Sequence, residues 1–201
     1  IVKCFRDEDL RADRQPEFTQ IDLEMSFVNE DDVMEINEGF IKHLFLDVMN
    51  MDVKTPFLRL PYKEAMDRFG SDKPDTRFGL ELNDISSVVA GCGFKVFTDA
   101  IENGGSVRAI NAKGLGANIS RKNIDSLGEF VKTYKAKGLA WIKINPDGVQ
   151  SPIAKFFTED KLNEILLKAE GGVGDVIFIV ADKPSVVFAS LGALRCEIAK
   201  R

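Results

Sequence analysis

The stretch Asp175-Val-Ile-Phe-Ile-Val-Ala181 is a continuous apolar run of the length of one strand. A run without polar alternation is typical of a strand that is buried on both faces. Strand-like segments at residues 107–110 and 139–144 accompany it, with helical patterns between them. Together they predict a sheet with helices packed on it, a compact α+β sandwich.

The predicted helices of this region have start and stop signals in the sequence. Ser120 is a candidate N-cap for a helix with an apolar face that ends at Gly138. A second helix starts at Thr158 and stops at Gly171, and Ser185 is a candidate cap for the last helix. The apolar faces contain Ile124, Leu127, Val131 and Tyr134, then Leu162, Ile165, Leu166 and Ala169, then Val187, Leu191, Leu194 and Ile198.

The N-terminal region reads as strand, polar loop, strand and helix. Residues 1–5 are strand-like, residues 6–16 form a charged loop, and apolar and polar residues alternate strictly over 19–27. That alternation predicts a strand with one apolar face, and its other face carries only hydrogen-bonding and acidic groups. Asn29 is a plausible N-cap for an amphipathic helix. Its apolar stripe consists of Val33, Ile36, Phe40, Leu44 and Val48.

Charge divides the chain into two regions that the net charge of −5 conceals. Residues 1–75 hold 10 basic and 18 acidic side chains, whereas residues 76–201 hold 17 and 14. The shift coincides with a stretch at residues 69–75 that contains Gly and Pro, so we predict domains at 1–75 and 76–201.

The composition excludes several classes of protein. With 44% apolar and 29% charged residues the chain is no collagen, coiled-coil rod or disordered tail. Three separated cysteines and one histidine support neither a zinc site nor a disulfide framework. Without a membrane-length apolar run or a signal peptide, we expect a cytoplasmic protein. Because the sequence opens on Ile1 within a strand-like stretch, we expect a fragment of a longer protein.

The charged loop and the strand after it contain the residues best suited to chemistry. If the first strand continues to Glu8, Arg6 and Glu8 share one face, and an arginine there can direct two donors onto a phosphate or carboxylate. The alternative is that Arg6 pairs with Asp7 or Glu8 on a solvated loop. Asp22 and Glu24 are neighbours on one face of the predicted strand, and two carboxylates so placed repel each other unless positive charge lies nearby. The pair therefore predicts cationic partners, and the alternative is an ordinary exposed acidic face.

Three segments resemble bacterial-type aspartyl-tRNA synthetases of class II. Residues 5–24, from Phe5-Arg-Asp-Glu-Asp through Gln-Ile-Asp-Leu-Glu24, resemble motif 2 of that class. Residues 69–77 resemble the segment where the family's chain leaves the catalytic core. Residues 95–195 resemble the inserted GAD domain, which the B-type subunit of tRNA-dependent amidotransferases shares. Its matching segments are Gly138-Leu-Ala-Trp-Ile-Lys143, Ser151-Pro-Ile-Ala-Lys-Phe156 and Leu191-Gly-Ala-Leu-Arg195.

The resemblance implies a fold and a set of site residues. Residues 1–75 would be part of an antiparallel-sheet catalytic core and 76–201 the GAD insertion. Arg6 would be the catalytic residue, in contact with the ATP α-phosphate and the aspartate carboxylate. The resemblance further implies that ATP is bound by Asp7, Glu8 and Gln15, and that aspartate is bound by Asp22 and Glu24. Two arginines of the loop, Arg11 and Arg14, would contact tRNA. For these arginines, local ion pairs with Asp9 and Asp13 are an equal alternative.

The implied function is that of an aspartate-tRNA ligase. Such an enzyme activates aspartate with ATP to aspartyl-adenylate and then transfers the aspartyl group to tRNA. It would be a homodimer that uses ATP with Mg2+ as a substrate and has no tightly bound cofactor. The partners are tRNA, aspartate and ATP, without a membrane, DNA or a protein-held metal. The isolated fragment is expected to be inactive. A non-enzymatic GAD-type module that contacts tRNA or has an architectural role is the alternative, and whether asparagine tRNA is also charged stays open.

Overall fold

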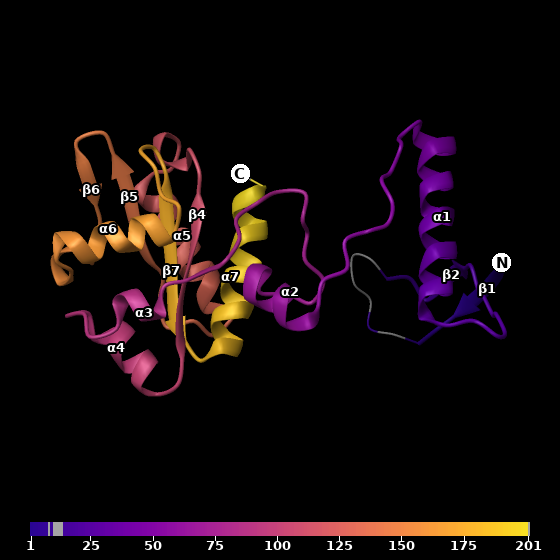
Figure 1. The fold of residues 1–201 in the computed structure, drawn as a ribbon, viewed down its shortest axis with the longest axis horizontal. Coiled ribbons are helices and arrows are strands. Elements are labelled where there is room, and N and C mark those ends of the chain that lie inside the picture. Colours follow the sequence, from indigo (N-terminus) through magenta and orange to yellow (C-terminus); the bar gives the residue numbers. More distant parts are fainter. Residues whose placement is uncertain (8, 10–13, 201) are drawn as a thin grey trace. The chain divides into compact units, whose positions relative to one another are not determined.

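A computed structural model describes residues 1–7, 9 and 14–200 of the chain (Figure 1). Contacts divide it into two units, Ile1–Arg59 and Leu60–Arg201. The division precedes residue 76 because helix α2 (Tyr62–Phe69) packs on helix α7 (Pro184–Ala199) of the second unit. The assignment of residues 1–75 and 76–201 to a catalytic core and an insertion stays a prediction.

The first unit contains a short antiparallel hairpin and one helix. Strand β1 (Val2–Phe5) pairs with β2 (Glu17–Gln20), and the last pair of the ladder joins Val2 to Gln20. The predicted strand over 19–27 is therefore wrong in extent. Residues 21–25 have no regular secondary structure, because within the described part of the chain no strand lies opposite them.

Helix α1 (Glu30–Met49) begins where the sequence predicts. Oδ1 of Asn29 accepts hydrogen bonds from the backbone N–H groups of Asp31 and Asp32, and the Asp32 carboxylate accepts one from the N–H of Asn29. This capping box confirms Asn29 as the N-cap. The helix ends at Asn50, which takes the left-handed conformation. None of its residues in this structure is buried, so its apolar stripe is at least partly exposed.

The second unit is built on a five-stranded antiparallel sheet with the order β3-β4-β7-β5-β6. Its central strand β7 (Val176–Asp182) pairs with β4 over its whole length and with β5 over residues 176–179. The structure thus confirms the predicted strands near 107–110, 139–144 and 175–181. The other strands are β3 (Asn83–Asp84), β4 (Ser106–Ala112), β5 (Ala140–Asn145) and β6 (Gly148–Gln150).

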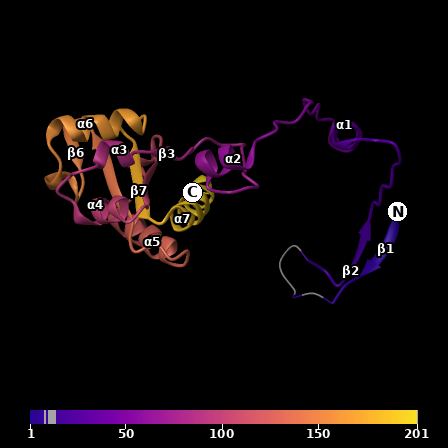
Figure 2. The same cartoon turned by 60° about the horizontal axis from the view of Figure 1, so that its bottom comes forward.

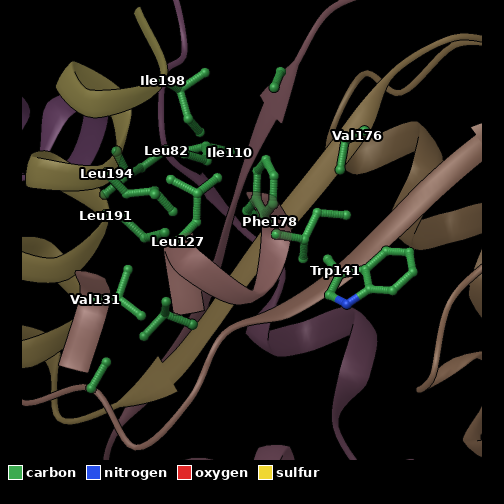
Figure 3. Close-up of a cluster of buried hydrophobic side chains, with 14 of the residues drawn as sticks. Leu82, Ile110, Leu127, Val131, Trp141, Val176, Phe178, Leu191, Leu194 and Ile198 are labelled. Carbon is green, nitrogen blue, oxygen red and sulfur yellow. The ribbon is translucent and has the colours of Figure 1, made fainter. Parts of the chain in front are cut away.

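Helices cover both faces of this sheet, as Figure 2 shows. Val176, Phe178 and Val180 of β7 face a core formed with α5 (Arg121–Lys132) and α7. The alternate residues Ile177 and Ile179 face a second core. This second core is formed with α3 (Ser86–Val89), α4 (Lys95–Glu102) and α6 (Glu159–Lys168). In the first core, Phe178 and Ile110 of the sheet lie near Leu191 and Leu194 of α7 (Figure 3).

The predicted cap Ser120 is confirmed, and Thr158, predicted as the start of a helix, is the N-cap of α6. The hydroxyl of Ser120 accepts from the N–H of Asn123, and that of Thr158 accepts from the N–H of Lys161. The last helix instead starts with Pro184 after Lys183, because proline lacks an N–H and suits the first helical position. Ser185 is therefore not its cap.

Helix α5 ends at Lys132, before the predicted stop at Gly138. The chain turns at Lys135, which has φ of 71°, and the N–H of Ala136 bonds the carbonyl of Val131. Helices α2, α3 and α4 have no counterpart in the sequence-based prediction. The two 3-10 turns, η1 (Leu115–Ala117) and η2 (Ala154–Phe156), were not predicted either.

Helix α2 and helix α7 meet at two glycines. A Cβ atom at Gly70 would lie 2.4 Å from the carbonyl oxygen of Phe188, and one at Gly192 would lie 2.7 Å from the carbonyl oxygen of Gly70. Gly70 also has φ of 68°, the left-handed conformation that ends α2. Only glycine fits this backbone-to-backbone contact.

Arg195 of α7 ties the segment between α2 and β3 to the core. Its side chain is 1% exposed, and Nη2 donates to the carbonyl oxygens of Asp75 and Gly79 at 2.9 Å each. Longer bonds of 3.3 Å reach Phe78 and Leu80, and the guanidinium lies over the rings of Phe69 and Phe78. Burial lowers the pKa of Arg195, and the nearby charge of Asp75 opposes that shift.

Asp175 holds the turn before β7 to the end of β4. Its carboxylate is buried and accepts bonds from Asn111 Nδ2 at 2.9 Å, the N–H of Gly114 at 2.8 Å and the N–H of Gly172 at 2.9 Å. Burial alone would raise the pKa of Asp175, but these donors, led by Asn111, outweigh it and lower the pKa. The charged carboxylate is therefore the form that stabilises the fold.

We predict that Arg195→Met lowers the free energy of unfolding by about 3 kcal/mol or more, because several buried carbonyl groups lose their donor. Urea titration followed by circular dichroism measures the change. Arg77→Met is the matched control, since Arg77 is 87% exposed and its ion pair with Asp75 should contribute less than about 1 kcal/mol. Equal losses in the two variants would contradict the role given to Arg195.

We also predict that Asp175 makes stability depend on pH. The pKa of Asp175 is lower in the folded chain than in the unfolded chain, where it is about 3.9. The stabilisation by its carboxylate is therefore complete above the pKa of the unfolded chain, and it is lost as pH falls through the pKa of the folded chain. Asp175→Asn should therefore destabilise the chain at pH 7 and reduce the acid slope of the unfolding free energy between about pH 5 and 2. Asp147→Asn, in the exposed turn between β5 and β6, should leave that slope unchanged.

Candidate functional site

The hairpin β1–β2 forms the base of the loop to which the sequence assigns the active-site residues. Phe5 lies opposite Glu17, and beyond this pair the N–H of Arg6 donates to the carbonyl oxygen of Pro16 at 2.9 Å. The backbone of Arg6, directly after β1, is therefore fixed by a hydrogen bond between the two arms of the hairpin.

One face of the hairpin positions the side chain of Arg6. Its guanidinium carbon lies 5.2 Å from the centre of the Phe18 ring, a cation–π distance. Phe18 is the diagonal cross-strand neighbour of Arg6, because Cys4 lies directly opposite Phe18. On the same face, Cys4 Sγ lies 3.5 Å from Gln20 Oε1. The planar guanidinium is thus stacked on an aromatic ring at the mouth of the loop.

The opposite face of the hairpin has a separate ion pair. Lys3 pairs with Glu17, and its ammonium lies 5.9 Å from the centre of the Phe5 ring. Both charged side chains are more than half exposed. Lys3 therefore belongs to the solvated face and takes no part in placing Arg6.

The other predicted ATP-binding residues lie at or beyond the base of the loop. Asp7 directly follows Arg6 on one side of the loop, and Gln15 directly precedes Pro16 on the other side. Both residues are exposed. Arg14, predicted to contact tRNA, is also exposed. Glu8 and Arg11 lie outside the described residues. The hairpin thus brings Arg6, Asp7 and Gln15 to one end.

Asp22 and Glu24 are not in the hairpin ladder. They follow the last residue of β2 in the irregular segment 21–25, and both are exposed. The prediction that they share a strand face is wrong for this structure, because the ladder that would impose alternation ends at Gln20.

A charged cluster in the second unit was not predicted from the sequence. Arg108 of β4 donates to the carboxylate of Asp67 at 2.8 Å and to its carbonyl oxygen at 2.9 Å. Hydrogen bonding from Lys63 and the charge of Arg108 lower the pKa of Asp67, although desolvation opposes them. An arginine among the mostly buried residues of β4 was the available signal, since a buried charge requires a partner. The cluster joins α2 to the sheet.

The described residues offer neither a metal site nor a membrane-spanning helix. No group of three or more His, Cys, Asp or Glu side chains there is arranged to hold a metal ion. No helix formed by these residues has the length and apolar character needed to cross a membrane.

Comparison with known proteins identifies close relatives. Aspartate–tRNA ligase of Clostridium perfringens is 63% identical over 201 residues, and that of Ruminiclostridium cellulolyticum is 64% identical over 202. Each alignment covers 100% of this chain and 34% of the relative, so the chain spans about a third of their length.

The family description "tRNA synthetases class II (D, K and N)" matches residues 1–183, which is most of the chain. This match includes the hairpin with Arg6 and extends through the central strand of the second unit. The chain therefore belongs to the class II tRNA synthetases of the D, K and N group.

Proposed function

We propose that this chain takes part in the aspartate–tRNA ligase reaction. The observation that carries the proposal is the identity of 63% with the Clostridium perfringens aspartate–tRNA ligase over all 201 residues. The substrates are then aspartate, ATP and tRNA, and Mg2+ enters with ATP as part of the substrate complex.

The first step of the reaction calls for a residue with the properties of Arg6. An aspartate carboxylate oxygen attacks the α-phosphorus of ATP, a P–O bond forms, and pyrophosphate leaves with the electrons of the broken bond. The carboxylate is already ionised at pH 7, so no general base is needed. Negative charge builds around the α-phosphate, and an arginine can donate two parallel hydrogen bonds to it.

The local structure supports Arg6 as the residue that does this. Its backbone is held by the bond to Pro16, and its guanidinium is stacked on Phe18. Both contacts restrict the side chain before a substrate binds, which reduces the entropy lost in the transition state. We call Arg6 the catalytic residue and Phe18 a positioning residue.

The other assignments belong to the same proposal. Asp7, Glu8 and Gln15 contact ATP, Asp22 accepts the α-ammonium group of aspartate, and Glu24 orients cationic side chains of the pocket. In the transfer step a hydroxyl of tRNA attacks the aspartyl carbonyl and AMP leaves. Arg11 and Arg14 contact phosphates of that tRNA. Because Asp22 and Glu24 lie outside the ladder, their role requires residues 21–25 to pair with a further strand.

We infer in addition that residues 1–75 correspond to motif 2 and part of the catalytic core, and that 76–201 form a GAD-type insertion in a homodimer. Two buried cores that belong wholly to the second unit support its treatment as a module. The same observation favours the second candidate function, a non-enzymatic module that contacts tRNA or supports the architecture.

A chimera tests the role of Arg6. In it this chain replaces the 201 matched residues of the Clostridium perfringens ligase. Arg6→Ala should slow aspartate-dependent ATP–pyrophosphate exchange by about a hundredfold or more, equivalent to about 3 kcal/mol, because a preorganised donor to the transition state is lost. Arg6→Lys keeps the charge without the planar fork and should also be severely impaired.

Two variants serve as controls in the same chimera. Lys3→Ala, on the opposite face of the hairpin, should leave pyrophosphate exchange within about twofold of the parent, since an exposed ion pair contributes little. Arg11→Ala should spare the exchange and reduce only transfer to tRNA. Exchange at the parental rate in Arg6→Ala would remove Arg6 from the site, and a folded but inactive chimera would overturn the proposed function.

Phe18→Leu tests the positioning role. Loss of the stacked ring should reduce kcat for pyrophosphate exchange by about two- to fivefold, the equivalent of an exposed cation–π contact of about 0.5–1 kcal/mol. The KM for ATP should change less, because the guanidinium itself remains. In an Arg6→Ala background Phe18→Leu should have no further effect. Additive losses in the double variant would show that Phe18 acts independently of Arg6.

A further inference from the structure

The last part of β7 has a partner strand on one side only. Strand β4 pairs with β7 as far as Ser106, which lies opposite Asp182, whereas β5 pairs with it only as far as Ala140, opposite Ile179. Residues 137–139, which precede β5, are not in a strand. Within the described part of the chain, residues 180–182 therefore have no strand beside them on the β5 side.

The register shows which backbone groups of β7 point to that open side. Val107 of β4 donates its N–H to Oγ of Ser86 at 2.9 Å, and its carbonyl oxygen accepts from the N–H of Ile85 at 3.0 Å. Both partners follow β3, so the backbone groups of Val107 point away from β7. Ala181 lies opposite Val107. In an antiparallel pair without mutual hydrogen bonds, both residues direct their N–H and C=O groups away from each other, so those of Ala181 point to the β5 side.

The start of the same strand gives an independent check. The carbonyl oxygen of Asp175, directly before β7, accepts from the N–H of Ile144 in β5 at 3.0 Å, so the backbone of Asp175 points to β5. Backbone groups alternate between the two edges of a strand, and Ala181 lies an even number of residues after Asp175. The groups of Ala181 therefore point to the same edge.

Ala181 presents an unused hydrogen-bond donor and an unused acceptor at this edge. Neither its N–H nor its C=O group bonds another residue of the described chain. Buried backbone groups are nearly always paired, and Ala181 is only 8% exposed. The residue nevertheless adjoins open space, because it lines two cavities.

The two cavities have volumes of about 250 and 360 Å3 and share Val96, Lys137 and Ala181 in their linings. An apolar cavity of about 150 Å3 can hold benzene, so the smaller cavity has room for an aromatic ring with a short substituent. Its lining is mostly apolar, and Lys137 is the charged residue in it. The apolar side chains include Phe94, Phe97, Leu139, Ile153 and Ile179.

Aromatic rings in this lining favour an aromatic ligand. The rings of Phe94 and Phe97 meet edge to face, with their centres 4.8 Å apart and an angle of 82° between them. The ring of Phe156 lies 5.1 Å from that of Phe94 on the same measure. A ligand ring beside Phe94 and Phe97 would extend this cluster in the offset or edge-on arrangements that aromatic pairs prefer.

We propose that the smaller cavity binds a small aromatic carboxamide. The amide oxygen accepts from the N–H of Ala181, an amide N–H donates to the carbonyl oxygen of Ala181, and the ring lies against Phe94 and Phe97. These are the two bonds that a further residue of β5 would have made. An ammonium group has no acceptor for the N–H, and a carboxylate has no donor for the carbonyl oxygen, so the amide is selected over both.

Lys137 does not change this selection. Its side chain is exposed and has no ion pair within the described residues, so its ammonium stays hydrated. The proposal is also independent of the ligase reaction, because every residue on which it depends lies in the second unit.

The test is a titration of the 201-residue chain with 3-phenylpropanamide, followed by 1H–15N NMR. We expect a dissociation constant on the order of 1 mM, typical of so small a ligand. The largest shift should be that of the Ala181 N–H, with smaller shifts at Phe97, Leu139 and Ala140.

Three compounds with the same ring and chain are the matched controls. Methyl 3-phenylpropanoate keeps the carbonyl oxygen but has no N–H, and it should bind about two- to tenfold more weakly because one hydrogen bond is lost. 3-Phenylpropanoate and 3-phenylpropylamine should also bind more weakly than the amide, since each satisfies only one of the two groups of Ala181.

Two substitutions separate the ring contact from the charge. Phe94→Leu should weaken amide binding about two- to fivefold because a ring contact is lost, whereas Phe130→Leu, at a half-buried ring of α5 outside the cavity, should have no effect. Lys137→Gln should leave amide binding within about twofold of the parent.

Four results would overturn the proposal. They are no shift of the Ala181 N–H at about tenfold excess over that constant, an ester that binds as tightly as the amide, a carboxylate that binds more tightly, and loss of amide binding in Lys137→Gln. The last two would assign the cavity to an anion held by Lys137.

Discussion

Neither face of β7 can be left in water. Val176, Phe178 and Val180 project to one side and Ile177, Ile179 and Ala181 to the other, and all are buried. A strand of this kind requires a helical layer on each side and a neighbouring strand along each edge. The positions of α5 and α7, of α3, α4 and α6, and of β4 and β5 follow from this requirement. The polar contacts of Asp175 and Arg195 then fix the segments that enter and surround this core.

Local signals predicted local structure well. The apolar run of β7, the caps Asn29 and Ser120 and the helix start at Thr158 were predicted because each depends on residues adjacent in sequence. The extent of the strand after Thr19 was not, because a strand lasts only as long as a partner lies beside it. The cap at Ser185 was wrong because Pro184, one residue earlier, already suits the first turn. Helix α2 was not predicted, and it packs on α7 through distant glycines.

The same limits apply to the sites. The alternation of β1 and the position of Pro16 place Arg6, Asp7 and Gln15 at one end of the hairpin, and this much could be predicted from the sequence. The stacking of Arg6 on Phe18 could not be predicted, because it depends on the register in which β1 pairs with β2. Arg108 and Asn111 interrupt an apolar strand and were visible in the sequence as polar residues in unfavourable positions. Their partners Asp67, Glu170 and Asp175 come from distant segments, so these contacts could not be predicted.

The position of β7 in the chain has a consequence for how the protein is made. Ser106 pairs with Asp182 and Ala140 pairs with Ile179, so the strand that joins β4 to β5 is synthesised after both. Until it leaves the ribosome, β4 and β5 are two edges without a common partner, and the helices around them have no completed sheet to cover. Helix α7 follows last and closes one core against Leu127 and Val131. Completion of the second unit's sheet therefore waits for β7, and the edges of β4 and β5 stay exposed and prone to aggregation until β7 has been made.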